Sequence, residues 1–170
     1  MKKIRLCQPV YKLNIPEHNF IKDVLLLFLE KTKSYSSKID NISSLDWEDA
    51  SNLDREWVSF FLPFWNQQVE TVIRDIECNS YSLQDIWFQQ YTDNGEHGWH
   101  THGGNFTGVY YLELDKKSPS TEIIDHFSKR KFCVKVKEGD MIIFPSHIKH
   151  RAPVNNGKRK TIISWNFEIL

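Results

Sequence analysis

Residues 99–104, with the sequence WHTHGG, decide the fold, because His100 and His102 stand two residues apart. Side chains alternate in direction along a β-strand, so two histidines at this spacing lie on one face of a strand. A second stretch, residues 139–150 (GDMIIFPSHIKH), ends in a third histidine, His150. The three imidazoles can meet only if the intervening strands fold back on themselves. The spacing therefore predicts a rolled sheet around a three-histidine site.

The three histidines indicate a metal site. Neutral imidazole binds first-row transition metals, and a set of ligands on one side of the metal leaves positions open for substrate and dioxygen. Five of the seven histidines fall in two short clusters, at 97–102 and 147–150. We expect His97 and His147 to be surface or hydrogen-bonding residues, and His100, His102 and His150 to bind the metal.

A cation follows the third histidine. Arg159 comes nine residues after His150 and is followed by Lys160 and Thr161. A guanidinium group is always charged and grips a carboxylate at two points. On a strand Thr161 points to the same side as Arg159 and can add a hydrogen bond, whereas Lys158 and Lys160 are expected to be solvated. The pattern indicates a mononuclear iron site with an anionic co-substrate.

Length and charge set the broad class of the protein. With 170 residues, 40% hydrophobic and 14% aromatic, the chain suits a single globular domain over 1–170. We expect a helical support over residues 1–80 and a β-barrel core over 81–170. Lysine plus arginine equals aspartate plus glutamate, 22 each, so no overall field attracts nucleic acid or anionic lipid. Nucleic acid is an unlikely partner on this ground.

The sequence predicts a cytoplasmic protein that does not enter a membrane. Residues 1–8 lack the apolar segment of a signal peptide. The longest apolar run, residues 24–29, is too short to span a bilayer. Cys7, Cys78 and Cys133 are scattered and odd in number, which predicts buried, reduced thiols rather than a disulfide framework.

Hydrophobic periodicity predicts helices first and strands after them. A first helix is expected to end near Lys33, and a second to run from Asp54 to about Glu77, with an interruption or kink at Pro63. Residues 34–52 are expected to form a long loop. Strands are expected at 9–14, 86–91, 106–114, 121–124, 131–136, 141–144 and 160–170. This order indicates an α+β, mainly β fold, an antiparallel barrel or sandwich with helices outside.

Four pieces of this sequence together resemble the 2-oxoglutarate- and iron(II)-dependent oxygenases, in particular a bacterial and phage branch. The pieces are residues 100–102 (HTH) with 107–112 (TGVYYL), residues 139–146 (GDMIIFPS), His150, and residues 159–166 (RKTIISWN). The resemblance implies a double-stranded β-helix, or jelly-roll (cupin-like) barrel, with iron inside one mouth.

The resemblance also implies roles for individual residues. His100 and His150 would be iron ligands. Arg159, aided by Thr161, would bind the distal carboxylate of 2-oxoglutarate, and Tyr111 would line the co-substrate pocket. The family reaction couples oxidative decarboxylation of 2-oxoglutarate by dioxygen to hydroxylation of a substrate C–H bond, giving succinate and carbon dioxide. The substrate would be a small molecule or a peptide.

His102 departs from the family pattern, because most members carry a carboxylate at this position. Three interpretations stay open. His102 is itself the second ligand, which strand alternation favours; or Asp93 or Glu96 from the preceding loop supplies a carboxylate; or the position is vacant. Two rival functions also remain: a cupin-like three-histidine metalloenzyme that does not use 2-oxoglutarate, and a non-catalytic jelly-roll binding module.

Overall fold

The computed structural model describes residues 8–125 and 127–170. Helices and strands alternate in the first half of the described chain, and the second half is all β. The elements in order are β1 (Tyr11–Asn14), α1 (His18–Lys31), β2 (Tyr35–Ser37), β3 (Ile42–Leu45), the short 3-10 helix η1 (Trp47–Asp49), α2 (Glu56–Asp75), β4 (Tyr81–Tyr91), β5 (His97–His100), β6 (Phe106–Glu113), β7 (Glu122–Ile124), β8 (Lys131–Cys133), β9 (Asp140–Pro145), β10 (His150–Ala152) and β11 (Lys160–Ile169).

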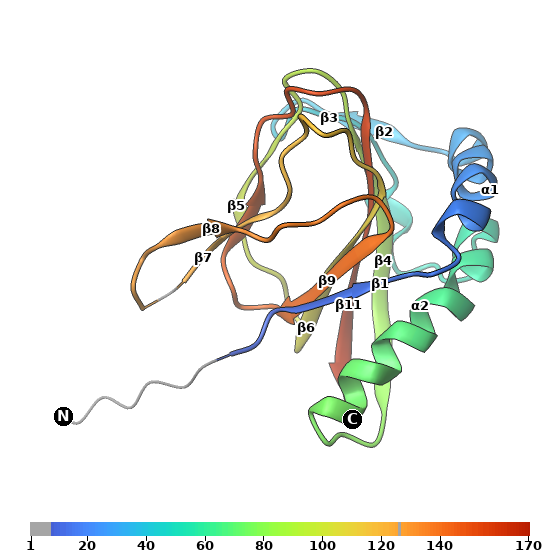
Figure 1. Ribbon diagram of the computed structural model, residues 1–170. Coiled ribbons are helices and arrows are strands. Elements are labelled where there is room, and N and C mark those ends of the chain that lie inside the picture. The colour runs from blue at the N-terminus through green and yellow to red at the C-terminus, as the bar shows by residue number, and fades with distance from the viewer. Residues whose placement is uncertain (1–7, 126) are drawn as a thin grey trace.

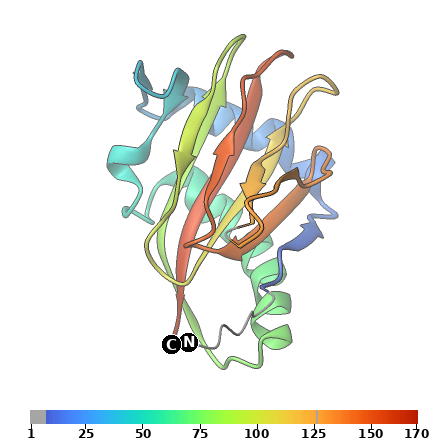
Figure 2. The ribbon, with the colours of Figure 1, turned by 90° about the vertical axis from the view of Figure 1, so that its left-hand side faces the viewer.

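The strands form two antiparallel sheets. The large sheet has the order β1-β9-β6-β11-β4-β3-β2, and the small sheet has the order β5-β10-β7-β8. Figure 1 shows α1 and α2 on one side of the large sheet and β5, β7 and β8 on the other. In the view turned by 90°, the long strands of the large sheet lie in front of the helices (Figure 2). This is the two-sheet architecture predicted from the sequence, with the helices outside.

The helix-facing side of the large sheet carries the larger apolar core. It joins buried side chains of α1 and α2 to residues of β4, β6, β9 and β11, including Trp65, Trp165 and Phe167. The Trp65 and Trp165 rings meet edge to face, with centroids 6.1 Å apart. Gly108 on β6 makes this packing possible, because a Cβ there would lie 2.3 Å from the Trp165 ring.

The other side of the large sheet faces the small sheet. A second apolar cluster lies there, with Tyr91, Tyr111 and Phe144 from the large sheet and Ile123 and Ala152 from the small one. Consequently the first eight residues of β11 are buried on both faces, although their side chains alternate. Polar residues buried in this inner space need partners or a function.

Two predicted elements need correction. Residues 34–52 hold the hairpin β2–β3, which adds two strands to the edge of the large sheet, so the support region is not only helical. The buried Ile42 and Leu45 anchor it, but strands this short show no periodicity. The second helix begins at Glu56 after Arg55 rather than at a cap by Asp54, and it runs through Pro63 as one element.

The cysteine prediction is corrected in part. Cys78 and Cys133 are free thiols, as expected, but Cys78 is half-buried and Cys133 is exposed on β8. Cys7 and nearly all of the segment expected not to be a signal peptide lie outside the described residues. Within the described chain, neither helix has the length and apolar character needed to cross a bilayer.

Candidate metal centre

The structure brings His100, His102 and His150 together. His100 ends β5 and pairs directly with His150 at the start of β10. His102 lies two residues beyond β5, where its backbone N–H donates to the Ser146 carbonyl at 3.0 Å. One nitrogen of each ring lies within 4.8 Å of those of the other two. Three imidazole nitrogens at this spacing can bind one transition-metal ion.

Backbone hydrogen bonds fix the tautomers of two of these rings. Nδ1 of His100 bonds to the Gly98 carbonyl at 2.7 Å, and Nδ1 of His150 bonds to the Ile148 carbonyl at 2.9 Å. A carbonyl oxygen only accepts, so each Nδ1 carries the hydrogen. Nε2 of each ring therefore keeps its lone pair, the arrangement that metal-binding histidines use.

Burial keeps the imidazoles neutral. Burial, with the neighbouring rings as a smaller cause, lowers the pKa of both His102 and His150 to about 3. Burial also lowers the pKa of His100, partly offset by its bond to Gly98. At neutral pH all three rings are therefore unprotonated and able to bind a metal.

The set of candidate ligands is all histidine. Among the described residues, the group of histidine, cysteine and carboxylate side chains close enough to hold a metal consists of His100, His102 and His150. Neither Asp93 nor Glu96 belongs to it, so this geometry favours His102 over a carboxylate from the preceding loop.

The two remaining clustered histidines differ in position. The exposed His147 bonds to Gln8 through Nε2 at 2.6 Å, on the surface as expected. His97 instead lies inside, with its ring stacked on that of His100 at a centroid distance of 3.9 Å and its Nε2 3.8 Å from a carboxylate oxygen of Asp40. His97 is therefore a neighbour of the candidate ligands. Its Nδ1 lies 3.4 Å from the side-chain amide nitrogen of Gln89, at hydrogen-bond distance.

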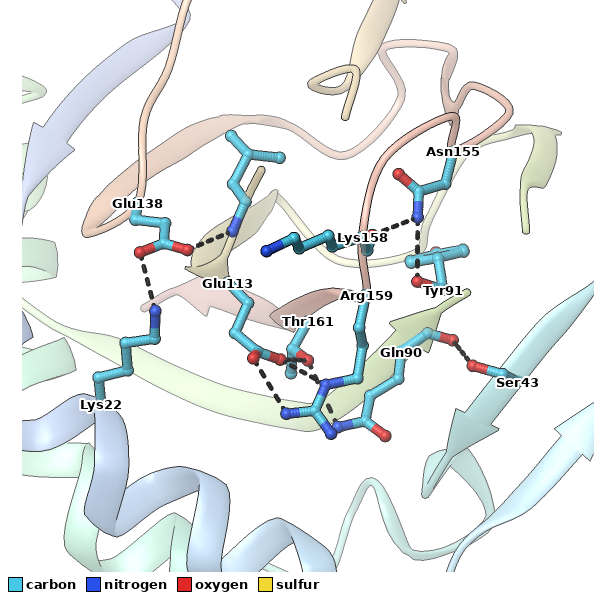
Figure 3. A network of polar contacts seen from close by, with 11 residues as sticks. Lys22, Ser43, Gln90, Tyr91, Glu113, Glu138, Asn155, Lys158, Arg159 and Thr161 are labelled. Carbon is cyan, nitrogen blue, oxygen red and sulfur yellow. Dashed lines mark hydrogen bonds and ion pairs between the residues drawn. The ribbon is translucent and has the colours of Figure 1, made fainter. Parts of the chain in front are cut away.

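Arg159 and Thr161 lie elsewhere, and their predicted place beside the histidines is wrong. Arg159 donates to the two carboxylate oxygens of Glu113 at 2.8 and 3.0 Å, and its side chain is 39% exposed. The Thr161 hydroxyl bonds to the same carboxylate and accepts a hydrogen bond from Gln90 (Figure 3). Thr161 lies on the face of β11 opposite to Ile162, which lines the cavity beside the histidines. Glu113 therefore pairs with the guanidinium group that the sequence pattern assigned to the co-substrate.

Lys160 is the buried cation, although the sequence suggested that it is solvated. Its residue is 2% exposed, its ammonium lies 4.6 Å from the centre of the Tyr91 ring, and its Nζ donates to the Pro119 carbonyl at 3.3 Å. Burial lowers the pKa of Lys160 to about 8. The Tyr91 hydroxyl, which is buried too, has no hydrogen-bond partner in the described chain. A buried cation with one carbonyl partner is suited to receive an anion.

Tyr111 is fully buried, in the same apolar cluster as Tyr91. Its hydroxyl donates to Thr121 Oγ1 at 2.7 Å and accepts from the Thr121 backbone N–H at 3.1 Å, and burial raises its pKa to about 12. Thr121 and Tyr91 line the same narrow cavity as the three histidines, about 20 Å³ in volume. An organic anion entering here must therefore displace side chains, whereas a water molecule need not.

Strand alternation carried a signal that separates Lys160 from Arg159. From Ile163 on, the apolar Ile163, Trp165 and Phe167 alternate with polar residues, and they pack toward the helices. Lys160 belongs to the other alternating set, which faces the small sheet. A second signal was Glu113, an acidic residue on the neighbouring strand that pairs with Arg159.

Comparison with solved structures identifies the fold family that this architecture resembles. No protein-family profile and no curated protein sequence matches this chain. Solved structures do: a Pseudomonas putida prolyl-4-hydroxylase has a TM-score of 0.70 at 10% identity, covering 96% of this chain and 94% of that one. The viral collagen prolyl hydroxylase of Paramecium Bursaria Chlorella virus-1, in its 2-oxoglutarate complex, gives 0.69 at 16% identity, with coverage of 95% and 96%.

A third structure extends the likeness beyond prolyl hydroxylases. An oxidoreductase of the 2OG-Fe(II) oxygenase family from Burkholderia pseudomallei has a TM-score of 0.73 at 8% identity, covering 94% of this chain and 84% of that one. Identities this low establish a common architecture and leave the chemistry to the site. The chain has the jelly-roll fold of the 2-oxoglutarate- and iron(II)-dependent oxygenases, as the resemblance in its sequence predicted.

Proposed function

We propose that this protein is an iron(II)- and 2-oxoglutarate-dependent dioxygenase that hydroxylates a C–H bond of its substrate and releases succinate and carbon dioxide. The observation that carries the proposal is the convergence of His100, His102 and His150 inside an oxygenase fold. Their unprotonated nitrogens suit iron(II), a first-row metal that imidazole binds well.

Lys160 supports the co-substrate part of the proposal. We assign it, in place of Arg159, as the partner of the distal carboxylate of 2-oxoglutarate. It is a buried cation with a single carbonyl as its hydrogen-bond partner, over the ring of Tyr91, whose hydroxyl is unpaired. A carboxylate bound to Lys160 would offset the cost of burying the ammonium. Tyr111 and Thr121 would line the same pocket.

The described side chains would hold and orient the reactants. The bound iron and 2-oxoglutarate would supply the oxidising chemistry, in which one atom of dioxygen goes to succinate and the other to the hydroxylated product. His100 and His150 have Nδ1 tied to the backbone, which leaves Nε2 of each ring as the nitrogen that would bind the metal. The apolar cluster around Phe144 and Ile162 excludes bulk water from the site.

Turnover of 2-oxoglutarate tests this function. Protein reconstituted with iron(II) and supplied with ascorbate, which reduces the second oxygen atom to water when no substrate is present, should convert 2-oxoglutarate and dioxygen to succinate and carbon dioxide, and His150→Ala should not. Lys160→Met should raise the concentration of 2-oxoglutarate needed at least about ten-fold, because a charged hydrogen bond is lost. The neighbouring cation variant Arg159→Met is the matched control and should behave like wild type. Iron-loaded protein that forms no succinate under any of these conditions would rule the function out.

The all-histidine ligand set favours a second candidate, a three-histidine metalloenzyme that does not use 2-oxoglutarate. This enzyme would bind the same metal through His100, His102 and His150. It would have no use for the anion site at Lys160, so its metal affinity would not respond to 2-oxoglutarate. A titration of metal with and without 2-oxoglutarate separates the two candidates.

A further inference from the structure

A second, wider pocket adjoins the histidines. Its volume is about 400 Å³, within the range of small-molecule sites. The residues that matter to its chemistry are Trp47, Asp85, Thr101, His102, Asn166 and Glu168. His102 also lines the cavity of the candidate metal centre. A molecule in the wider pocket would therefore contact one of the proposed ligands.

Asn166 lines this pocket and has a buried, unpaired acceptor. The residue is 5% exposed, and its Oδ1 has no hydrogen-bond partner in the described chain. Its Nδ2 donates to a carboxylate oxygen of Asp85 at 3.3 Å, and the two residues are cross-strand neighbours on β11 and β4. A carboxylate can only accept, so the amide nitrogen must be the atom facing Asp85. Oδ1 is therefore left to accept a hydrogen from a ligand.

The charge of the pocket has one sign. Asp85 and Glu168 contribute carboxylates, and among the lining residues, all of which the structure describes, there is neither lysine nor arginine. Asp85 is half-buried and Glu168 is exposed. Two carboxylates and one unpaired amide oxygen equal in number the three N–H donors of a primary ammonium group.

Trp47 adds an apolar wall. It is 44% exposed, and its ring meets Trp87 edge to face at a centroid distance of 4.5 Å, which holds it in place. An aromatic face of this kind packs against an aliphatic stem or attracts a cation.

We propose that this pocket binds the substrate through an aliphatic primary ammonium group, as on a lysine side chain. The ammonium lies at Asp85 and Asn166, the stem packs on Trp47, and the carbon chain leads toward His102. This assignment rests on the proposed oxygenase function, because it makes the pocket the substrate site of the same centre. The group can belong to a free amino acid or to a residue of a peptide.

Equilibrium binding to the metal-free protein tests the proposal without relying on activity. Tryptophan fluorescence is followed during titration with L-lysine and with L-norleucine, which differs in lacking the ε-ammonium. The same comparison is made with the Nα-acetyl, C-amide forms as peptide mimics. We expect one lysine probe to bind at least about ten-fold more tightly than its norleucine counterpart. Preference for the free or the blocked form identifies the source of the ammonium.

Variants localise the effect. Asp85→Asn should abolish the preference for lysine over norleucine, and Glu168→Gln should weaken it less because Glu168 is exposed. Asp23→Asn, an exposed carboxylate on α1, is the matched control and should retain the full preference. Equal binding of lysine and norleucine probes, no binding of either, or an unchanged preference in Asp85→Asn would overturn the assignment.

The outcomes separate this inference from the proposed function. Succinate formation without a lysine preference would remove the substrate class and leave the oxygenase intact. The opposite outcome is a lysine preference of the wild type that is lost in Asp85→Asn, in a protein that forms no succinate when loaded with iron. That result would support the ammonium pocket and reject the oxygenase function.

Discussion

On β11, Ile163, Trp165 and Phe167 pack toward the helices, while Lys160 and Ser164 lie on the face toward the small sheet. Both faces are buried, but different kinds of side chain cover them. The helix side is filled with aliphatic and aromatic side chains, so its contribution is packing and the hydrophobic effect. The side between the sheets combines a smaller apolar cluster with imidazoles and a buried lysine.

The difference shows which half of the protein is built for stability and which for binding. Buried polar groups without partners lower stability unless a ligand completes them. The Tyr91 hydroxyl and Asn166 Oδ1 are such groups on the side that holds the histidines or the pocket beside them, and Lys160 there has a single carbonyl as its partner. Within the described residues, the helix side has unpaired indole N–H groups on Trp65 and Trp165. Substitutions of the polar residues on the inner face should therefore remove binding at little cost in stability, and substitutions of the large apolar residues on the outer face should do the reverse.

The largest effect is expected from His150→Ala. Loss of one of three imidazole ligands should abolish iron(II) binding, because two remaining nitrogens hold the metal far more weakly. Anaerobic metal titration measures it. The matched control is His147→Ala, an exposed histidine three residues away, which should bind iron like wild type. Equal loss in both variants would mean that the metal is held on the surface.

Trp165→Ala should have the next largest effect, and on stability. Removing this fully buried ring should lower the free energy of unfolding by about 3–5 kcal/mol, measured by urea denaturation. Ser164→Ala, its neighbour on the inner face, should change stability by much less. If the two variants lose similar stability, the contrast between the faces does not hold.

Lys160→Met should stabilise the protein at neutral pH, by about 1–4 kcal/mol, because an incompletely paired buried cation is replaced by an apolar side chain. The pKa of Lys160 is lowered to about 8 in the folded chain and stays near its usual value, about 10.4, in the unfolded one. Between these values the unfolded chain binds more protons, so wild-type stability rises with pH.

The advantage of Lys160→Met should therefore shrink between about pH 8 and pH 10, as the folded-state amine of the wild type loses its proton earlier than that of the unfolded chain. Urea denaturation at several pH values measures this change. A pH-independent difference between variant and wild type would indicate that Lys160 is not buried as a cation.

Arg159→Ala should have the smallest effect. Its pair with Glu113 is partly exposed, so its loss should cost at most about 1 kcal/mol of stability. Affinity for 2-oxoglutarate, measured by calorimetry in the presence of a divalent metal, should not change. A large loss of that affinity would indicate that Arg159, and not Lys160, binds the co-substrate.

The sequence predicted the histidine cluster and most strands, because their signals are local or involve residues with few other uses. His100 and His102 at strand spacing, with the separate histidine His150, predicted a rolled sheet, and the three rings do meet, although His102 lies two residues beyond β5 and not on a strand. The inner face of β11 was missed because the predicted anion site followed the sequence distance of Arg159 from His150, although Ser164 and Asn166 alternate with the apolar residues of the helix face. The hairpin β2–β3 was missed since each strand is too short to show a period.

The most direct test of the central claim is the visible absorption of the protein mixed with iron(II) and 2-oxoglutarate under anaerobic conditions. Joint binding at His100, His102 and His150 with Lys160 predicts a metal-to-ligand charge-transfer band that is retained in Arg159→Ala, lost in His150→Ala, and shifted to higher 2-oxoglutarate concentration in Lys160→Met. A wild-type protein that binds both ligands without the band, or a band that survives in His150→Ala, would contradict the account.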